Sequence, residues 1–344
     1  MQPICDRIDT SVKPCVHYRG DGLCNLRTQF KCIEYTRRNE PNLSYSQMAE
    51  WSRCKRKWYY SHLVGLELIE LPVPLQRGRL ASDTLDLIHG GDPHPLVAIR
   101  AAYSPEQESD RVEVELGRLE GLFSWYIESP FGEIRGKTQY PFEWSMSDYP
   151  RLTGYVDMVY PTTEPTMGYE FKYTENPSNY TKLNVNDQLS AYFLGNKNLE
   201  RITLRLIQVP TIRPTKSESQ SQYVERVYGE CKKKKPVIDR HYWRSEFDLE
   251  AFAEKARWIA KEIVEACDRG MNGCYQNLNA CYAPGECEYL PVCEAGGAIS
   301  ETIYKYKDEK EKDMAIIYFT NPRDSSMGKL LNEGYFFSGW IKDI

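Results

Sequence analysis

The sequence predicts a mixed α/β protein of the α+β type, with a central mixed sheet flanked by helices. Residues 135–173 form short segments rich in β-branched and aromatic residues and broken by Pro, Gly and Thr, a pattern typical of consecutive antiparallel strands. Segments before and after them repeat apolar residues at helical spacing, most strongly across residues 247–270. At 344 residues the chain is long enough for one large domain or two ordinary ones.

The first predicted helix begins near Ser44 or Ser46, where Met48, Trp51 and Trp58 recur at helical spacing. The further predicted elements are helices at 78–90, 111–127, 183–195 and 247–270, strands at 135–146, 151–160 and 167–173, a nearly continuous apolar and therefore central strand at 202–210, and an edge strand at 221–229.

Composition favours a soluble cytoplasmic protein. Hydrophobic residues make up 41% and charged residues 27%, and no run of about 18 apolar residues predicts a membrane span. The first residues, MQPICDRIDTSVKPC, contain no apolar core of a signal peptide, so export is not expected. In a reducing compartment, eleven cysteines are better interpreted as metal ligands than as a disulfide framework.

The formal net charge of −5 argues against a protein that coats nucleic acid by bulk charge. Local positive patches would have to bind DNA, and the candidates are Lys55, Arg56 and Lys57 together with the run 232–235. The alternative for each patch is a solvated surface. Some of the 25 tyrosines are candidates for stacking on bases.

Residues 1–40 form a short polar segment that carries four cysteines: Cys5, Cys15, Cys24 and Cys32. Such a segment buries little core, so a bound metal would stabilise it, with zinc as the default and a second iron–sulfur cluster as the alternative. A loose arm or a flap on the main domain are the other interpretations. Residues 42–295 are predicted to form the main domain, and 296–344 an appendage without a predicted role.

The middle strands can build a carboxylate metal site. Glu170 and Lys172 alternate with Phe171 on one strand, so the two charged side chains share a face while Phe171 points into the core. If the preceding strand pairs with this one as a hairpin, Asp157 converges on Glu170. Two carboxylates and the Phe171 carbonyl would suit Mg²⁺ or Mn²⁺. A surface ladder of alternating charge is the alternative interpretation.

The next helix adds Gln188 and Tyr192, which are spaced i, i+4 and can face the same site. Four other cysteines, Cys54 upstream and Cys281, Cys287 and Cys293 downstream, can close around one metal centre. The last three have five residues between each neighbouring pair.

These motifs resemble the PD-(D/E)XK nuclease superfamily, whose fold is restriction-endonuclease-like, and in particular its RecB-like iron–sulfur branch. That branch includes CRISPR-associated nucleases, AddB nuclease domains and phage exonuclease-like proteins. The motifs are SYSQMAEWSRCKRKWYY, GRLASDTLD, GYVDMVY, GYEFKY, DQLSAYF and CYAPGECEYLPVC, within residues 42–295. The resemblance implies that Asp157 and Glu170 bind metal and that Lys172 is catalytic. It also implies that Gln188 and Tyr192 support the site and that the four cysteines hold a 4Fe–4S cluster.

Two departures from the pattern stand out. Many relatives have a metal-site His four residues after the glycine of the first helix, where this chain has Ser82. Asp83 or Asp86 could substitute, or the site could keep two carboxylates and more waters. The cysteine spacing is wider than in the CRISPR and AddB types, and Cys274 is a substitute ligand if Cys281 is not one.

The sequence therefore predicts a metal-dependent deoxyribonuclease, an exonuclease on DNA ends or single strands in recombination, repair or phage DNA metabolism, with a protein partner for DNA loading as a further hypothesis. A catalytically weak DNA-end-binding protein and a structural metal protein of a viral or recombination assembly are the alternatives. The absence of the first-helix His favours the former, and the N-terminal cysteines favour the latter.

Overall fold

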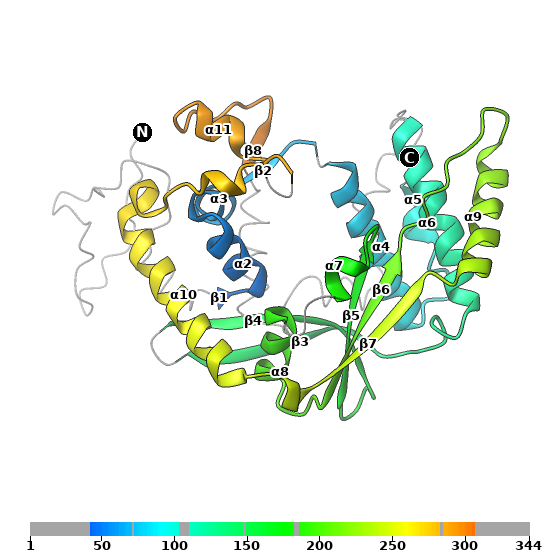
Figure 1. Cartoon of the computed structure of the whole chain (residues 1–344), viewed down its shortest axis with the longest axis horizontal. Coiled ribbons are helices and arrows are strands. Elements are labelled where there is room, and N and C mark those ends of the chain that lie inside the picture. The colour runs from blue at the N-terminus through cyan, green and yellow to red at the C-terminus, as the bar shows by residue number, and fades with distance from the viewer. Residues whose placement is uncertain are drawn as a thin grey trace, which may run out of the picture. The chain divides into compact units, whose positions relative to one another are not determined.

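The computed structural model describes residues 42–306 except 71, 103–109, 147–148, 182–185 and 283–284 (Figure 1). The predictions for Cys5, Cys15, Cys24 and Cys32, and for the tail after residue 306, lie outside the described residues. The chain forms two compact units. The described parts of unit 1 are residues 42–69, 145–152 and 255–306, and those of unit 2 are 70–144 and 153–254.

The central sheet is mixed, as predicted, and its strands follow the order β1-β4-β5-β6-β7 with β3 paired to β4. Its strands are β1 (Asn42–Leu43), β3 (Lys137–Met146), β4 (Tyr149–Tyr160), β5 (Met167–Thr174), β6 (Arg201–Gln208) and β7 (Val237–Trp243). β4 and β5 are antiparallel, β5 and β6 are parallel, and β6 and β7 are antiparallel. β6 has six consecutive buried residues, which confirms the predicted central strand.

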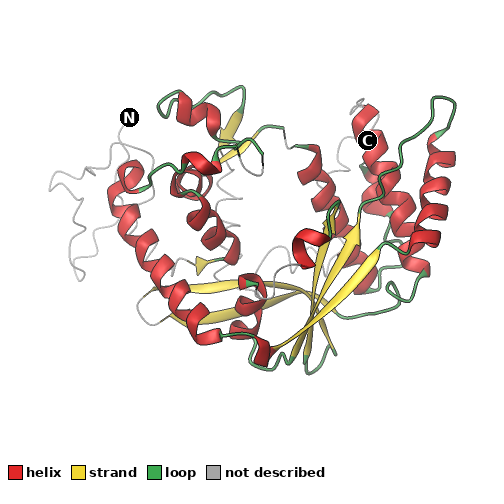
Figure 2. Cartoon of the chain, in the orientation of Figure 1, coloured by secondary structure: helices red, strands yellow, loops and turns green. Residues whose placement is uncertain are grey.

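One face of this sheet in unit 2 is covered by helices α4 (Val73–Gly90), α5 (Val97–Ala101), α6 (Asp110–Glu128) and α9 (Gln220–Lys234) (Figure 2). Their buried residues form one hydrophobic core, against which Phe171 and Tyr173 of β5 pack. α7 (Ser178–Thr181) and α8 (Asp187–Gly195) follow β5. The Asn186 side chain caps α8 by accepting a hydrogen bond from the Gln188 N–H.

The predicted edge strand at 221–229 was wrong, because this segment lies within α9. Ser219 and Gln222 form a capping box at its start, and Tyr223, Val227 and Cys231 recur every four residues on the buried face. Aromatic and β-branched content suggested a strand, but the helical period and the cap determine the structure. β7 occupies the sheet edge instead.

Unit 1 contains α2 (Tyr45–Arg53), α3 (Lys55–Trp58) and a π-helical turn, Tyr59–Val64. The Ser44 side chain caps α2, and Met48 and Trp51 are buried, as the helical spacing predicts. A small second sheet pairs β2 (Leu66–Leu68) with β8 (Tyr304–Tyr306), which belongs to the segment that the sequence suggests is an appendage.

The remaining elements are α10 (Leu249–Arg269), short 3₁₀ turns at Arg244–Glu246, Gly270–Gly273 and Leu278–Ala280, and α11 (Leu290–Glu294). α10 begins in unit 2 and continues in unit 1 from Lys255. Within the described part of the chain, no helix combines the length and apolar character needed to cross a lipid bilayer.

Candidate active site

The β4–β5 hairpin brings Asp157 and Glu170 together. The strands pair with Met158 opposite Tyr169, which places the acidic residue of each strand beside this pair. The Phe171 N–H donates a hydrogen bond to Asp157 Oδ2 at 2.8 Å, so the aspartate is tied to the residue that follows Glu170. The predicted hairpin geometry is therefore present.

Glu170 is the centre of a group of four polar side chains. Its exposed fraction is 1%. Lys172 Nζ lies 2.5 Å from Glu170 Oε1, and the Tyr192 hydroxyl donates to Glu170 Oε2 at 2.6 Å. The Gln188 amide donates to the Tyr192 hydroxyl oxygen at 2.8 Å. The five residues predicted for the site thus meet in unit 2.

The packing of α8 explains why Tyr192 reaches Glu170. The Phe142 ring contacts the Tyr192 ring edge-on, with 5.4 Å between centroids. That ring occupies the space where Gly154 has no side chain, since a Cβ there would lie 2.8 Å from Phe142 Cε1. Gly154 thus allows the aromatic contact that orients α8 over the carboxylates.

Acidic side chains are concentrated in this site. Burial and then repulsion from Glu170 raise the pKa of Asp157 well above its usual range. Burial alone would lower the pKa of Lys172, but the Glu170 and Asp157 carboxylates raise it above its ordinary value. The two carboxyl groups repel each other when both are ionised beside a single lysine, and a divalent cation would relieve this repulsion.

A third acid, Asp86 on α4, acts on the carboxylate pair through its charge, which further raises the pKa of Asp157. Gln139 of β3 donates through Nε2 to both Asp86 carboxylate oxygens, at 3.2 and 2.9 Å. Burial, and then repulsion from Asp83, raise the pKa of Asp86 to about 7, although the Gln139 hydrogen bonds lower it. Ser82, at the position of the expected His, is exposed.

Gln139 was not predicted as a site residue. Its φ of 48° is in the left-handed region, which a non-glycine residue in a strand rarely adopts. Strained backbone of this kind clusters at functional sites. Nothing in the local sequence signals it, since its partner Asp86 lies 53 residues earlier in the chain.

Among the described residues, no three His, Cys, Asp or Glu side chains converge closely enough to coordinate one ion. Asp157 and Glu170 are thus a two-carboxylate site with Asp86 farther out. Mg²⁺ is commonly bound by one or two carboxylates and keeps several waters, so this donor set fits it.

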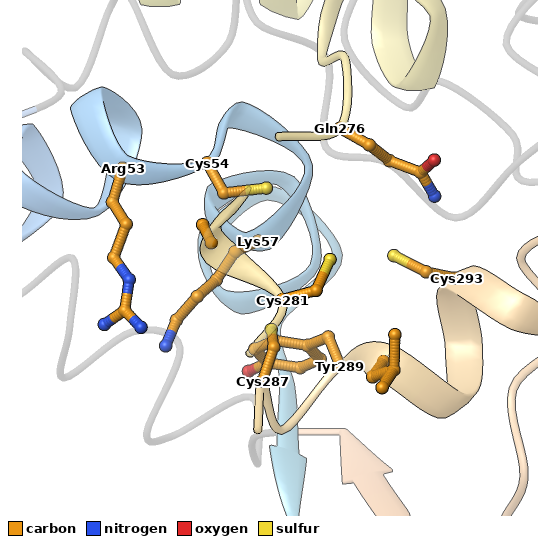
Figure 3. Close-up of a pocket in the computed structure, with 10 residues that line it drawn as sticks. Arg53, Cys54, Lys57, Gln276, Cys281, Cys287, Tyr289 and Cys293 are labelled. Atoms are coloured by element: carbon orange, nitrogen blue, oxygen red, sulfur yellow. The ribbon is translucent and has the colours of Figure 1, made fainter. Parts of the chain in front are cut away.

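The four cysteines predicted to bind a cluster line one pocket of unit 1 (Figure 3). Figure 3 shows the sulfurs of Cys54, Cys281 and Cys293 turned toward one another, with Cys287 beside them. Cys274 does not line this pocket, and its exposed fraction is 0%. The structure therefore groups Cys281, rather than Cys274, with the other three.

Positive and amide groups surround these thiols. Arg53, Lys57 and Gln276 also line the pocket. Burial raises the pKa of the Cys293 thiol, and a hydrogen bond with Gln276 lowers it. Burial likewise raises the pKa of the Cys287 thiol, and the positive charge of Lys57 lowers it. Lys57 is held in place by ion pairs with Glu288, at 2.7 Å, and Glu50, at 3.4 Å.

An acidic pair beside a lysine on a mixed sheet is typical of metal-dependent phosphodiester hydrolases. The family model of the PD-(D/E)XK nuclease superfamily matches residues 42–294, and the chain belongs to this superfamily. Its members are typically nucleases that use Mg²⁺ or Mn²⁺. The superfamily predicted from the motifs is confirmed, whereas the match does not distinguish the iron–sulfur branch. No curated protein matches the chain.

Proposed function

We propose that this chain is a deoxyribonuclease that cleaves DNA at ends or in single strands with Mg²⁺ or Mn²⁺. The observation that carries the proposal is the convergence of Lys172 and Tyr192 on Glu170, with Asp157 tied to the adjacent Phe171 N–H. Asp157, Glu170 and the Phe171 carbonyl would hold the ion. When bound, it would activate a water and neutralise charge on the scissile phosphate.

The other side chains of the site stabilise charge on the phosphate or orient the carboxylates. The Lys172 ammonium offers a positive charge to the phosphate, where negative charge develops in the transition state. Tyr192 and Gln188 hold the Glu170 carboxylate in one orientation through consecutive hydrogen bonds. Asp86, oriented by Gln139, would accept hydrogen bonds from metal-bound waters and would thereby compensate for the serine at the expected His position.

Digestion of linear DNA tests this function. We expect the full chain to degrade end-labelled single- or double-stranded DNA with Mn²⁺, and to stop when EDTA is added. Closed circular DNA of the same sequence is the control for end dependence. DNA binding without cleavage at any Mn²⁺ concentration would contradict the nuclease assignment and leave the DNA-end-binding protein as the function.

We also propose a 4Fe–4S cluster held by Cys54, Cys281, Cys287 and Cys293, which would assign the chain to the RecB-like iron–sulfur branch. The four thiols share one pocket, and the charges of Lys57 and Arg56, which act on Cys287 and Cys293, can balance the negative charge of thiolate ligands. Each thiolate of such a cluster binds its own iron, so the sulfurs need not converge on one ion. Its role here would be structural, joining segments that are more than two hundred residues apart.

The pKa of Asp86 predicts how stability depends on pH without metal. Because its folded-state pKa is raised to about 7, its stabilising contribution is complete below the unfolded pKa of about 4 and is lost as the pH rises through about 7. Asp86→Asn removes this loss. In thermal unfolding with EDTA, we expect the variant to gain about 2–4 °C on the wild type between pH 5 and pH 8.

Glu164→Gln changes an exposed acid of the same unit and is the matched control, which should not reproduce the gain of Asp86→Asn. Mn²⁺ needs deprotonated carboxylates, so it should raise the wild-type Tm more at pH 8 than at pH 6. A difference in Tm between Asp86→Asn and wild type that stays constant from pH 5 to pH 8 would contradict the raised pKa of Asp86.

A further inference from the structure

A buried chain of polar residues connects the far edge of the sheet to the strand of the active site. It begins at Arg205 of β6, whose exposed fraction is 2%. Arg205 lies opposite Asp239 of β7 in the strand register and donates to both of its carboxylate oxygens, at 2.8 and 2.7 Å. On the other side of β6, Arg205 lies opposite Phe171 of β5. The arginine is therefore fixed between the edge strand and the active-site strand.

The network of polar residues continues from Arg205 through Tyr126 of α6 to His89 of α4. Arg205 Nη1 donates to the Tyr126 hydroxyl oxygen at 3.0 Å. His89 Nδ1 lies 2.8 Å from the Ile134 carbonyl, which can only accept, so Nδ1 carries the hydrogen. His89 Nε2 lies 3.0 Å from the Tyr126 hydroxyl.

The Arg205 guanidinium can only donate, so the single hydroxyl hydrogen of Tyr126 is directed at His89 Nε2, which accepts it. The Tyr126 hydroxyl therefore donates to His89 while it accepts from Arg205. Each group has one role, and a buried network in which every group is paired adopts one arrangement.

The network ends at a contact between two rings. The His89 ring stacks on the Phe171 ring with 4.8 Å between centroids and 4° between planes. The Phe171 main chain donates to Asp157 and lies between Glu170 and Lys172. Restricting the Phe171 ring therefore restricts the main chain that follows Glu170 and that donates to the Asp157 carboxylate.

We propose that Asp239, Arg205, Tyr126 and His89 are positioning residues of the nuclease site, which hold Phe171 so that Asp157, Glu170 and the Phe171 carbonyl keep the spacing that a divalent ion requires. This inference rests on the proposed function. Metal sites need their ligands within about 0.5 Å of the productive geometry, and supporting hydrogen bonds around the ligands commonly change metal affinity about 10–100-fold. An ordinary polar cluster of the core would instead affect stability alone.

Tyr126→Phe tests the proposal, because it removes one oxygen and leaves the ring in place. Tyr223→Phe is the matched control: Tyr223 is also fully buried in this core, and its hydroxyl donates a hydrogen bond to the Ile212 carbonyl, away from the carboxylate pair. We expect similar losses of Tm in both variants. Only Tyr126→Phe should weaken Mn²⁺ binding in calorimetry, about 10-fold, and lower kcat with little change in KM for DNA.

Equal Mn²⁺ affinity and equal kcat in the two variants, with an active wild type, would overturn the positioning role and leave the proposed function intact. A wild type that neither binds Mn²⁺ nor cleaves DNA would overturn both. If Tyr126→Phe does not fold, Phe171→Leu decides the question, since it keeps the carbonyl and removes the ring that His89 contacts. Loss of Mn²⁺ affinity in that variant supports the proposal, and wild-type affinity overturns it.

Discussion

Glu170→Gln is expected to abolish DNA cleavage, with kcat lowered at least about 10³-fold, while the chain stays folded. The substitution removes one of the two carboxylate charges that would hold the ion. Glutamine has nearly the same shape and can still accept the hydrogen bond from Tyr192. The substitution also removes the charge repulsion that raises the pKa of Asp157, and losing this repulsion limits the loss of stability. The measurement is single-turnover cleavage of end-labelled DNA, with Mn²⁺ affinity from calorimetry.

Lys172→Gln separates binding of the ion from catalysis. Since Lys172 is proposed to act on the phosphate, this variant should keep its affinity for Mn²⁺ and lose cleavage, whereas Glu170→Gln should lose both. Glu164→Gln and Lys197→Gln change exposed residues of the same unit and should behave as the wild type. Cleavage by Glu170→Gln within about threefold of wild type would refute the assignment of the site.

Much of this site could be predicted because its geometry follows from two short periodicities. Alternation along a strand places Glu170 and Lys172 on one face, and the hairpin of β4 and β5 brings Asp157 alongside. A spacing of four residues on a helix aligns Gln188 with Tyr192. Each of these relations spans few residues, so the local sequence contains it.

The parts that could not be predicted depend on pairing between distant segments. His89, Tyr126 and Arg205 come together only after α4, α6 and β6 have packed, and separately each is an ordinary buried polar residue. Gln139 has a left-handed backbone conformation, and its side chain donates to Asp86, 53 residues earlier. The error at 221–229 had another cause, because residues with high strand propensity occupy the buried face of a well-capped helix.

The second large effect is expected at the cysteine pocket. Cys287→Ser should remove the visible absorption of the purified protein and lower its Tm by about 10–20 °C. Joining Cys54 to a loop more than two hundred residues away restricts the unfolded chain by on the order of 5 kcal/mol, and losing one ligand removes that restriction. The measurements are anaerobic purification, iron analysis and thermal unfolding.

Cys274→Ala is the matched control, because Cys274 is a buried thiol of the same unit that does not line the pocket. It should keep the iron and the absorption of the wild type. Iron that persists in Cys287→Ser must be assigned by mutating Cys5, Cys15, Cys24 and Cys32 separately, since these residues form a second candidate site. A Cys287→Ser protein that retains its colour, its Tm and full activity would eliminate the cluster at this pocket, and a colourless wild type containing zinc would replace it with a zinc site.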